Sequence, residues 1–311
     1  MRPEERGAAG VVPGDTPAGI EVHRFGHEAM ATVFEVFSAH DDRGYASQAA
    51  LAAFDLVDRL ERELSRFRDS SDVSRINALA AGQETRVTPE TMECLEIARR
   101  MHRLTGGAFD ISLGTGLEQI ELVTDGFLVR ARADGVRLDL GGIGKGYAVD
   151  RMAELLDEWE IPRVLLHGGF SSVLAREPPP GRGGWPLTLT APDGGERIRV
   201  SARRQALSAS GTQKGAHIVD PRTGQPARHR AAWVALPCPE TPGGAPGAWI
   251  DVLRSPAAVA EALSTAFMLL PMPEIGALCR RGPGLEAWVF PEPTGSGASG
   301  ADLVHLARRR P

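Results

Sequence analysis

The sequence predicts an α+β fold, with mixed or antiparallel sheets flanked by helices in a single large domain. Three observations lead to this prediction. Of the 311 residues, 42% are hydrophobic, which is enough apolar material for a sizeable core. Strand-like and helix-like segments do not alternate regularly, so a doubly wound parallel sheet is not required. No repeat or obvious domain linker interrupts residues 20–290.

In the first half of the chain, residues 20–39 have strand character because β-branched and aromatic residues surround Gly26. Residues 45–67 predict a long amphipathic helix with an apolar stripe at helical spacing. The stripe consists of Ala49, Ala53, Leu56, Leu60 and Leu64. A short helix is expected to end near residue 77, after a polar turn.

A further helix is predicted from Pro89 to about Leu104, with Thr88 as its N-cap and the glycines of 105–107 as its stop. Residues 108–112 are expected to form a short strand. Two strands of a hairpin are expected within residues 126–140.

The second half predicts two more helices, one from about Lys145 to Trp159 and one over residues 255–271. Ser255 can cap the later helix, and Pro256 suits its first turn. The remaining expected elements are strands at 163–169, near 186–190, near 196–200 and at 285–290, and loops at 176–185 and 238–248.

Three segments are assigned along the chain. Residues 1–19 mix charge, proline and glycine, and we expect a flexible arm there. Residues 20–290 carry the predicted domain. Residues 291–311 are expected to be a linker-like tail, because their first half is rich in proline, glycine and serine.

Composition disfavours several classes of protein. A net charge of −5 and an aromatic content of 5% argue against a nucleic-acid-binding surface. Cys94, Cys238 and Cys279 are odd in number and far apart, so neither a disulfide framework nor a cysteine zinc site is expected. The sequence contains neither a membrane-length apolar run nor a signal-peptide core. We therefore expect a cytoplasmic protein that does not insert into membranes.

The stretch "LDLGGIGKGYAVDRM" (138–152) combines four glycines and Lys145 within six residues, directly before a predicted helix. Glycines allow backbone N–H groups to approach a ligand, and a helix start and a lysine both favour an anion such as pyrophosphate. The stretch is neither a Walker A loop nor a Rossmann fingerprint. A tight strand-to-helix turn with a surface lysine is the alternative.

Two other stretches could carry chemistry. His217 lies close to Asp220 in "HIVDPRTG" (217–224), and a histidine beside a carboxylate can act as a general base. An ordinary turn with an incidental histidine explains the same sequence. In the last strong helix, Glu261 and Thr265 are four residues apart and offer hard oxygen ligands suited to Mg²⁺. The alternative there is an exposed glutamate and a helical threonine.

Two patterns carry weaker signals. His23 and His27 in "HRFGH" are spaced for a helical metal site, but Gly26 argues against a helix there. "GFSSV" (169–173) resembles a nucleophile elbow only loosely, because it lacks the second glycine.

Taken together and in order, seven segments resemble the ApbE family of FAD:protein FMN transferases. They are "MATVFEV" (30–36), "LSRFRDSSDVSRIN" (64–77), "TGGAFDISLG" (105–114), "LDLGGIGKGYAVD" (138–150), "LLHGGFSSVLA" (165–175), "SASGTQKGAHIVDPRTG" (208–224) and "AEALSTAFMLL" (260–270). The resemblance runs from about Met30 to Leu270 and weakly to Phe290. It implies transfer of FMN from FAD to a Thr or Ser hydroxyl of an acceptor protein, with help from Mg²⁺ and release of AMP.

The resemblance also implies roles for individual residues. His217 would be the base, with Asp220 alongside. Gly142, Glu261 and Thr265 would hold the metal. The FAD site would be lined by Met30, Phe67, Ala108, Phe109, Asp110, Asp139, Lys145 and Ile218.

The sequence departs from the family pattern at several positions. Glu261 stands where the family usually has an aspartate, and its extra methylene is expected to shift the metal or change its affinity. Ala31 and Gly144 replace a glycine and an alanine, and two segments, one between 114 and 138 and one between 211 and 217, are shortened. Three other functions therefore stay open: an FAD-binding protein that does not transfer, an FAD pyrophosphatase, and a generic phosphate-ester hydrolase.

Overall fold

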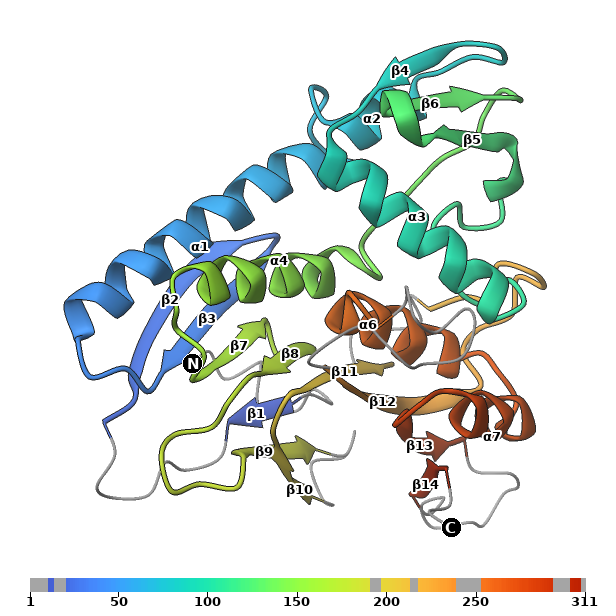
Figure 1. Ribbon diagram of the computed structural model, residues 1–311. Coiled ribbons are helices and arrows are strands. Elements are labelled where there is room, and N and C mark those ends of the chain that lie inside the picture. Colours follow the sequence, from blue (N-terminus) through green and yellow to red (C-terminus); the bar gives the residue numbers. More distant parts are fainter. Residues whose placement is uncertain are drawn as a thin grey trace.

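An eight-stranded antiparallel sheet lies at the centre of the molecule (Figure 1). The computed structural model describes residues 11–13, 21–190, 197–212, 218–238, 253–292 and 303–308. The strand order is β14-β13-β12-β11-β8-β7-β3-β2, and every neighbouring pair is antiparallel. The strands are β2 (His23–Ala29), β3 (Thr32–Ser38), β7 (Val164–Gly168), β8 (Ser172–Ala175), β11 (Gln205–Gly211), β12 (His229–Pro237), β13 (Glu286–Pro291) and β14 (Val304–Ala307).

Three helices cover one face of this sheet (Figure 1). They are α1 (Arg43–Leu64) over β2 and β3, α4 (Gly144–Glu158) over β7 and β8, and α6 (Pro256–Phe267) over β11 and β12. The main hydrophobic core lies between these helices and the sheet. A second core, with Trp185, Trp233 and Trp288, lies on the other face against the small sheet of β1 (Val11–Pro13), β9 (Trp185–Thr190) and β10 (Arg197–Ala202).

The remaining described elements extend from this centre. Helix α3 (Pro89–Leu104) packs on α6, and α7 (Met272–Arg281) packs on β14. A third sheet has the order β4-β6-β5. Its strands are β4 (Glu84–Arg86), β5 (Ile120–Val123) and β6 (Leu128–Ala131). Helix α2 (Asp72–Asn77) packs against β4 and β6, and the short 3-10 turns Leu117–Gln119 and Thr124–Gly126 flank β5 along the chain.

The predicted α+β class is confirmed, and two predicted strands are wrong. Residues 108–112 form turns, and residues 136–140 form no strand, so β6 pairs with β4 and β5 instead. One backbone hydrogen bond, from Asp139 N to Ile111 O at 2.7 Å, joins the two stretches. Their alternating apolar side chains are buried without a strand ladder. Within the expected tail 291–311, β14 adds an edge strand to the main sheet, while most of the expected loop 238–248 lies outside the described residues.

Helices α4 and α6 meet at an unusually close backbone contact. A Cβ added at Gly146 would lie 2.3 Å from the carbonyl oxygen of Ala257, so only glycine fits at this point. The side chain of Asp150, one turn further along α4, accepts the N–H groups of Ala257 and Ala258 at 2.9 and 2.8 Å. A buried carboxylate of α4 therefore caps the first turn of α6.

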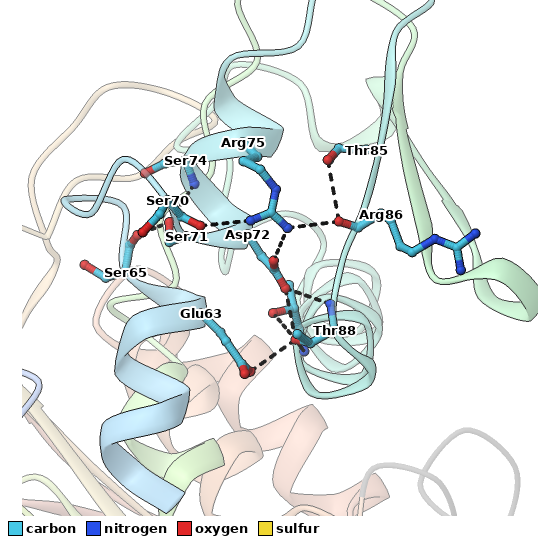
Figure 2. A network of polar contacts seen from close by, with 11 residues as sticks. Glu63, Ser65, Ser70, Ser71, Asp72, Ser74, Arg75, Thr85, Arg86 and Thr88 are labelled. Carbon is cyan, nitrogen blue, oxygen red and sulfur yellow. Dashed lines mark hydrogen bonds and ion pairs between the residues drawn. The ribbon is translucent and has the colours of Figure 1, made fainter.

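A polar network fixes the chain between α1 and α3 (Figure 2). The buried carboxylate of Asp72 accepts the backbone N–H and the hydroxyl of Thr88, at 2.8 and 2.9 Å, and pairs with Arg75. The Thr88 hydroxyl oxygen also caps α3 and lies 3.1 Å from Glu63 Oε2, and burial raises the pKa of Glu63. The network anchors both sides of the short segment that carries Arg66 and Phe67.

His167, on β7, is a buried neutral imidazole. Its residue is 1% exposed, and its Nε2 atom has no hydrogen-bond partner among the described residues. The ring of Phe37 lies edge-on to it, with centroids 5.6 Å apart. Burial lowers the pKa of His167 to about 3, because the charged form would lose its hydration.

The helix contact gives a first prediction. Gly146→Ala should lower the free energy of unfolding by about 1–3 kcal/mol, because the new methyl group forces α4 and α6 apart. Gly144→Ala is the matched control in the same helix, since a Cβ there meets nothing within 4 Å. It should be neutral or stabilising by up to about 1 kcal/mol. Urea denaturation measures both variants, and equal costs would contradict the close contact.

Acid sensitivity gives a second prediction. In the unfolded chain His167 binds a proton below about pH 6.5, whereas the folded protein keeps it neutral down to about pH 3. Its contribution to stability is therefore complete above about pH 6.5 and falls by about 1.4 kcal/mol per pH unit as the pH drops. His167→Gln should remove this part of the pH dependence, measured by denaturation between pH 7 and 5. The exposed His305→Gln should keep the wild-type slope.

Candidate active site

The glycine-lysine bend, residues 138–146, turns the chain sharply into α4. Helix α4 begins at Gly144, and Ile143 provides no side-chain cap for it. The cap comes from α6 instead, because Glu261 Oε2 accepts the N–H of Gly146 at 2.6 Å. The other carboxylate oxygen of Glu261 pairs with the ammonium of Lys145, which also donates to Gly141 O at 3.3 Å.

The candidate metal ligands lie close together. Thr265 follows Glu261 by one helical turn and donates its hydroxyl to the Glu261 carbonyl at 3.2 Å. A Cβ added at Gly142 would lie 3.7 Å from Thr265 Oγ1 and 3.2 Å from the Phe109 ring. The bend and α6 therefore meet at the residues that the sequence singled out.

Asp139 is one of the residues that line a pocket of about 270 Å³. Its carboxylate accepts the N–H of Gly141 at 2.8 Å and pairs with Arg66 at 3.0 Å. The guanidinium of Arg66 lies 4.4 Å from the ring centroid of Phe67, which is 81% exposed. The pocket is lined by Arg66, Ser74, Asn77, Leu113, Arg137, Leu138 and Asp139.

The loop after α3 forms another wall of the site. Ala108 and Phe109 are buried, and Phe109 lies under Gly142. Asp110 folds the loop on itself, because its carboxylate accepts the N–H groups of Ser112 and Gly114 at 2.8 and 3.0 Å. Asp110 thus shapes the wall through backbone contacts.

Met30 lies in the tight turn between β2 and β3. Met30 and Ala31 have φ values of 49° and 57°, the left-handed region that a two-residue hairpin turn requires. Beside this turn, a Cβ added at Gly169 would lie 2.4 Å from the Thr32 hydroxyl. The preceding Gly168 faces the backbone of Lys145, so these turns pack behind the bend.

The turn that begins at Ile218 docks against the loop after α3. Ile218 is largely buried, and Pro221 O lies 2.8 Å from the position of a Cβ at Gly114. Asp220 is buried, and Arg222 donates to both of its carboxylate oxygens. These hydrogen bonds lower the pKa of Asp220. His217, the predicted base, lies outside the described residues.

Some site residues were missed by sequence reasoning. Arg66, Asn77 and Arg137 line the pocket, although the first two stand within a stretch already singled out. The Ser210 hydroxyl lies 3.4 Å from the Thr265 hydroxyl. Ser208 and Ser210 both form hydrogen bonds with the Ser264 hydroxyl. The signal was the serine alternation in "SASG", which places both hydroxyls on one face of β11.

Glu261, Thr265 and the backbone of Gly142 offer oxygen atoms that suit a hard cation. A carboxylate, a hydroxyl and a backbone carbonyl are oxygen ligands of the kind that Mg²⁺ takes, usually with substrate phosphates completing the shell. The described part of the chain contains no cluster of three or more His, Cys, Asp or Glu residues that could hold a metal alone. An ion held here would take the Glu261 carboxylate, the Thr265 hydroxyl and the Gly142 carbonyl, with further oxygens supplied by a ligand.

One membrane-related finding accompanies the site. Among the helices that the structure describes, none has both the length and the apolar character needed to cross a bilayer.

Known proteins resemble this chain over most of its length. A family model described as the ApbE family matches residues 30–120 and 114–289. A Klebsiella pneumoniae protein named FAD:protein FMN transferase is 23% identical over 256 residues, covering 68% of this chain and 73% of that protein. A Treponema pallidum protein of the same name is 26% identical over 291 residues, covering 77% and 76%.

Solved structures share the fold. The flavin transferase ApbE from Vibrio cholerae matches with a TM-score of 0.76 and 17% identity, covering 93% of this chain and 98% of that one. The apo flavinyl transferase ApbE from Pseudomonas stutzeri matches with a TM-score of 0.74 and 22% identity, covering 93% and 95%.

The buried carboxylate gives the third prediction. Glu261→Gln should lower the free energy of unfolding by about 1–3 kcal/mol, because it removes the ion pair with Lys145 and weakens the cap on Gly146. The exposed Glu158→Gln, in α4, is the control and should change stability by less than about 0.5 kcal/mol. Thermal and urea denaturation provide the measurement. An equal, small effect in both variants would show that Glu261 does not stabilise the bend.

Proposed function

The chain belongs to the ApbE family, and from this premise we propose that it transfers FMN from FAD to a threonine or serine hydroxyl of an acceptor protein. The observation that carries the proposal is the meeting of the glycine-lysine bend with Glu261 and Thr265, next to a pocket that Asp139 of the bend also lines. The names of the relatives support the same reaction.

The proposed step is a phosphoryl-group displacement. The acceptor hydroxyl oxygen bonds to the phosphorus on the FMN side of the pyrophosphate, and the bond from that phosphorus to the bridging oxygen breaks. AMP leaves with the bridging oxygen and its electron pair, and the hydroxyl proton passes to a base. The products are a phosphodiester-linked FMN and AMP, so the atoms balance.

Lys145 and the start of α4 suit the pyrophosphate. The ammonium is the kind of donor that holds a phosphate at a helix start, whereas the N–H groups of Gly141, Ile143, Gly144 and Gly146 already donate within the protein. Phe109 and Ala108 provide an apolar floor under the bend, and the exposed ring of Phe67 offers a face for stacking. Met30, Asp110, Asp139 and Ile218 are proposed to complete the FAD site from the surrounding turns.

His217 is proposed as the base that accepts the hydroxyl proton. Asp220 is assigned a positioning role, because Arg222 occupies both of its carboxylate oxygens and favours its charged form. The fixed turn that follows Ile218 would then set where His217 enters the site.

Mg²⁺ is proposed as the metal of the site, held by Glu261, Thr265 and the backbone of Gly142. Its chemistry, when bound, is neutralisation of charge on the pyrophosphate and on the departing AMP.

The fourth prediction tests the reaction directly. The purified protein, incubated with FAD, Mg²⁺ and a candidate acceptor flavoprotein, should produce a fluorescent acceptor band on a denaturing gel and an equal amount of AMP by chromatography. Acceptor Thr→Ala or Ser→Ala at the target, His217→Ala, and EDTA should each abolish the band.

The products also distinguish the other candidate functions. FMN and AMP free in solution, with no labelled acceptor, would indicate a pyrophosphatase. FAD-dependent thermal stabilisation without either product would indicate an FAD-binding protein that does not transfer. Hydrolysis of simple phosphate esters without a flavin requirement would indicate a generic hydrolase.

A further inference from the structure

Glu261 is a buried anion with one cationic partner among the described contacts. Its residue is 4% exposed, and a carboxylate at such a depth requires compensation of its charge. Lys145 supplies a positive charge on one oxygen, and the N–H of Gly146 satisfies the other. Loss of Lys145 would therefore leave Glu261 with a single uncharged donor.

Lys145 occupies an unusual place for a cation. It is the second residue of α4, where the aligned peptide dipoles favour negative charge and disfavour positive charge. Its side chain is 23% exposed, so the ammonium lies at the edge of the site rather than fully inside it. The pairing with Glu261 offsets this unfavourable position, and an anionic ligand would offset it in the same way.

We propose that Lys145 is an exchangeable cation: its ammonium pairs with the Glu261 carboxylate whenever no divalent metal is bound there. A metal bound to Glu261 neutralises the carboxylate and releases the ammonium, which then pairs with a phosphate of the dinucleotide. The inference rests on the proposed function, because it assumes that a metal and a pyrophosphate share this site. It adds that the two ligands bind cooperatively through one lysine.

Lys145 and a divalent cation compete for one carboxylate oxygen of Glu261. Lys145 and a divalent cation both require Glu261, so each lowers the apparent affinity of the other. A phosphate ligand removes Lys145 from this competition by giving the ammonium a second partner. Reciprocity then requires the metal to strengthen nucleotide binding by the same factor.

The test compares Lys145→Met with the wild type and uses Mn²⁺ as the probe. Without nucleotide, Lys145→Met should bind Mn²⁺ about tenfold or more tightly than the wild type, measured from the free Mn²⁺ signal by electron paramagnetic resonance. Lys145→Arg keeps a positive charge and should bind Mn²⁺ as weakly as the wild type. The double variant Lys145→Met, Glu261→Gln should lose the tight binding.

Thermal stability gives a second readout. In EDTA, Lys145→Met should melt below the wild type because Glu261 has lost its cation, and Mn²⁺ should raise its melting temperature more than that of the wild type. Lys145→Gln serves as a second neutral variant if the methionine variant does not fold. FAD affinity, followed by flavin fluorescence, should rise more with Mg²⁺ in the wild type than in Lys145→Met.

The outcomes separate this inference from the proposed function. Equal or weaker Mn²⁺ binding by the neutral variants would overturn the exchange, whether or not an acceptor is labelled. Tight Mn²⁺ binding that survives in the double variant would overturn it too, because Glu261 would not be the ligand. Failure to label an acceptor, together with the expected Mn²⁺ results, would overturn only the transfer reaction.

Discussion

The close contact between α4 and α6 is the constraint on which the rest of the site depends. Each helix caps the other: Asp150 of α4 accepts the first N–H groups of α6, and Glu261 of α6 accepts the N–H of Gly146. Gly146 allows this because any side chain would meet the carbonyl of Ala257. The exchange locks two helix ends that lie more than a hundred residues apart in the sequence.

The central sheet positions the remaining walls of the site relative to this helix contact. Helix α4 lies on β7 and β8, and α6 lies on β11 and β12, so the bend is held over the middle of the eight-stranded sheet (Figure 1). Gly168, the last residue of β7, faces the side chains of Val149 and Phe34 and the carbonyl oxygen of Lys145. The loop after α3 completes the floor, with Phe109 beneath Gly142. Rigid elements thus position residues that are mostly carried by turns.

Sequence reasoning predicted α1, α2, α3, α4 and α6 because their apolar periodicity, caps and glycine stops agree with one another, but it missed α7 at Met272–Arg281. It misplaced strands at 108–112 and 136–140, where alternating apolar residues are buried in loops and no ladder forms. It also missed β8, β11 and β12, since their alanine and serine content gives little strand signal.

The candidate site was predicted in part. The expectation that Gly142, Glu261 and Thr265 meet came from the family resemblance, because the spacing of residues along the chain does not show that the bend packs on a helix 115 residues away. Two contacts had no signal in the sequence: the ion pair of Glu261 with Lys145, and the engagement of Asp220 by Arg222. Both depend on side-chain directions that only the packed fold determines.

Charge balance links the architecture to the chemistry. In the described part of the bend and its partners, Lys145 and Arg66 offset Glu261 and Asp139, so this part of the site is close to neutral before any ligand arrives. A pyrophosphate entering alone would add negative charge beside two carboxylates, and a divalent cation entering alone would add positive charge beside a lysine. Either excess is costly in a partly buried site. A dinucleotide and a metal that bind together keep this part of the site close to neutral. Glu261, the carboxylate that caps α4, is the buried charge that makes this neutrality necessary.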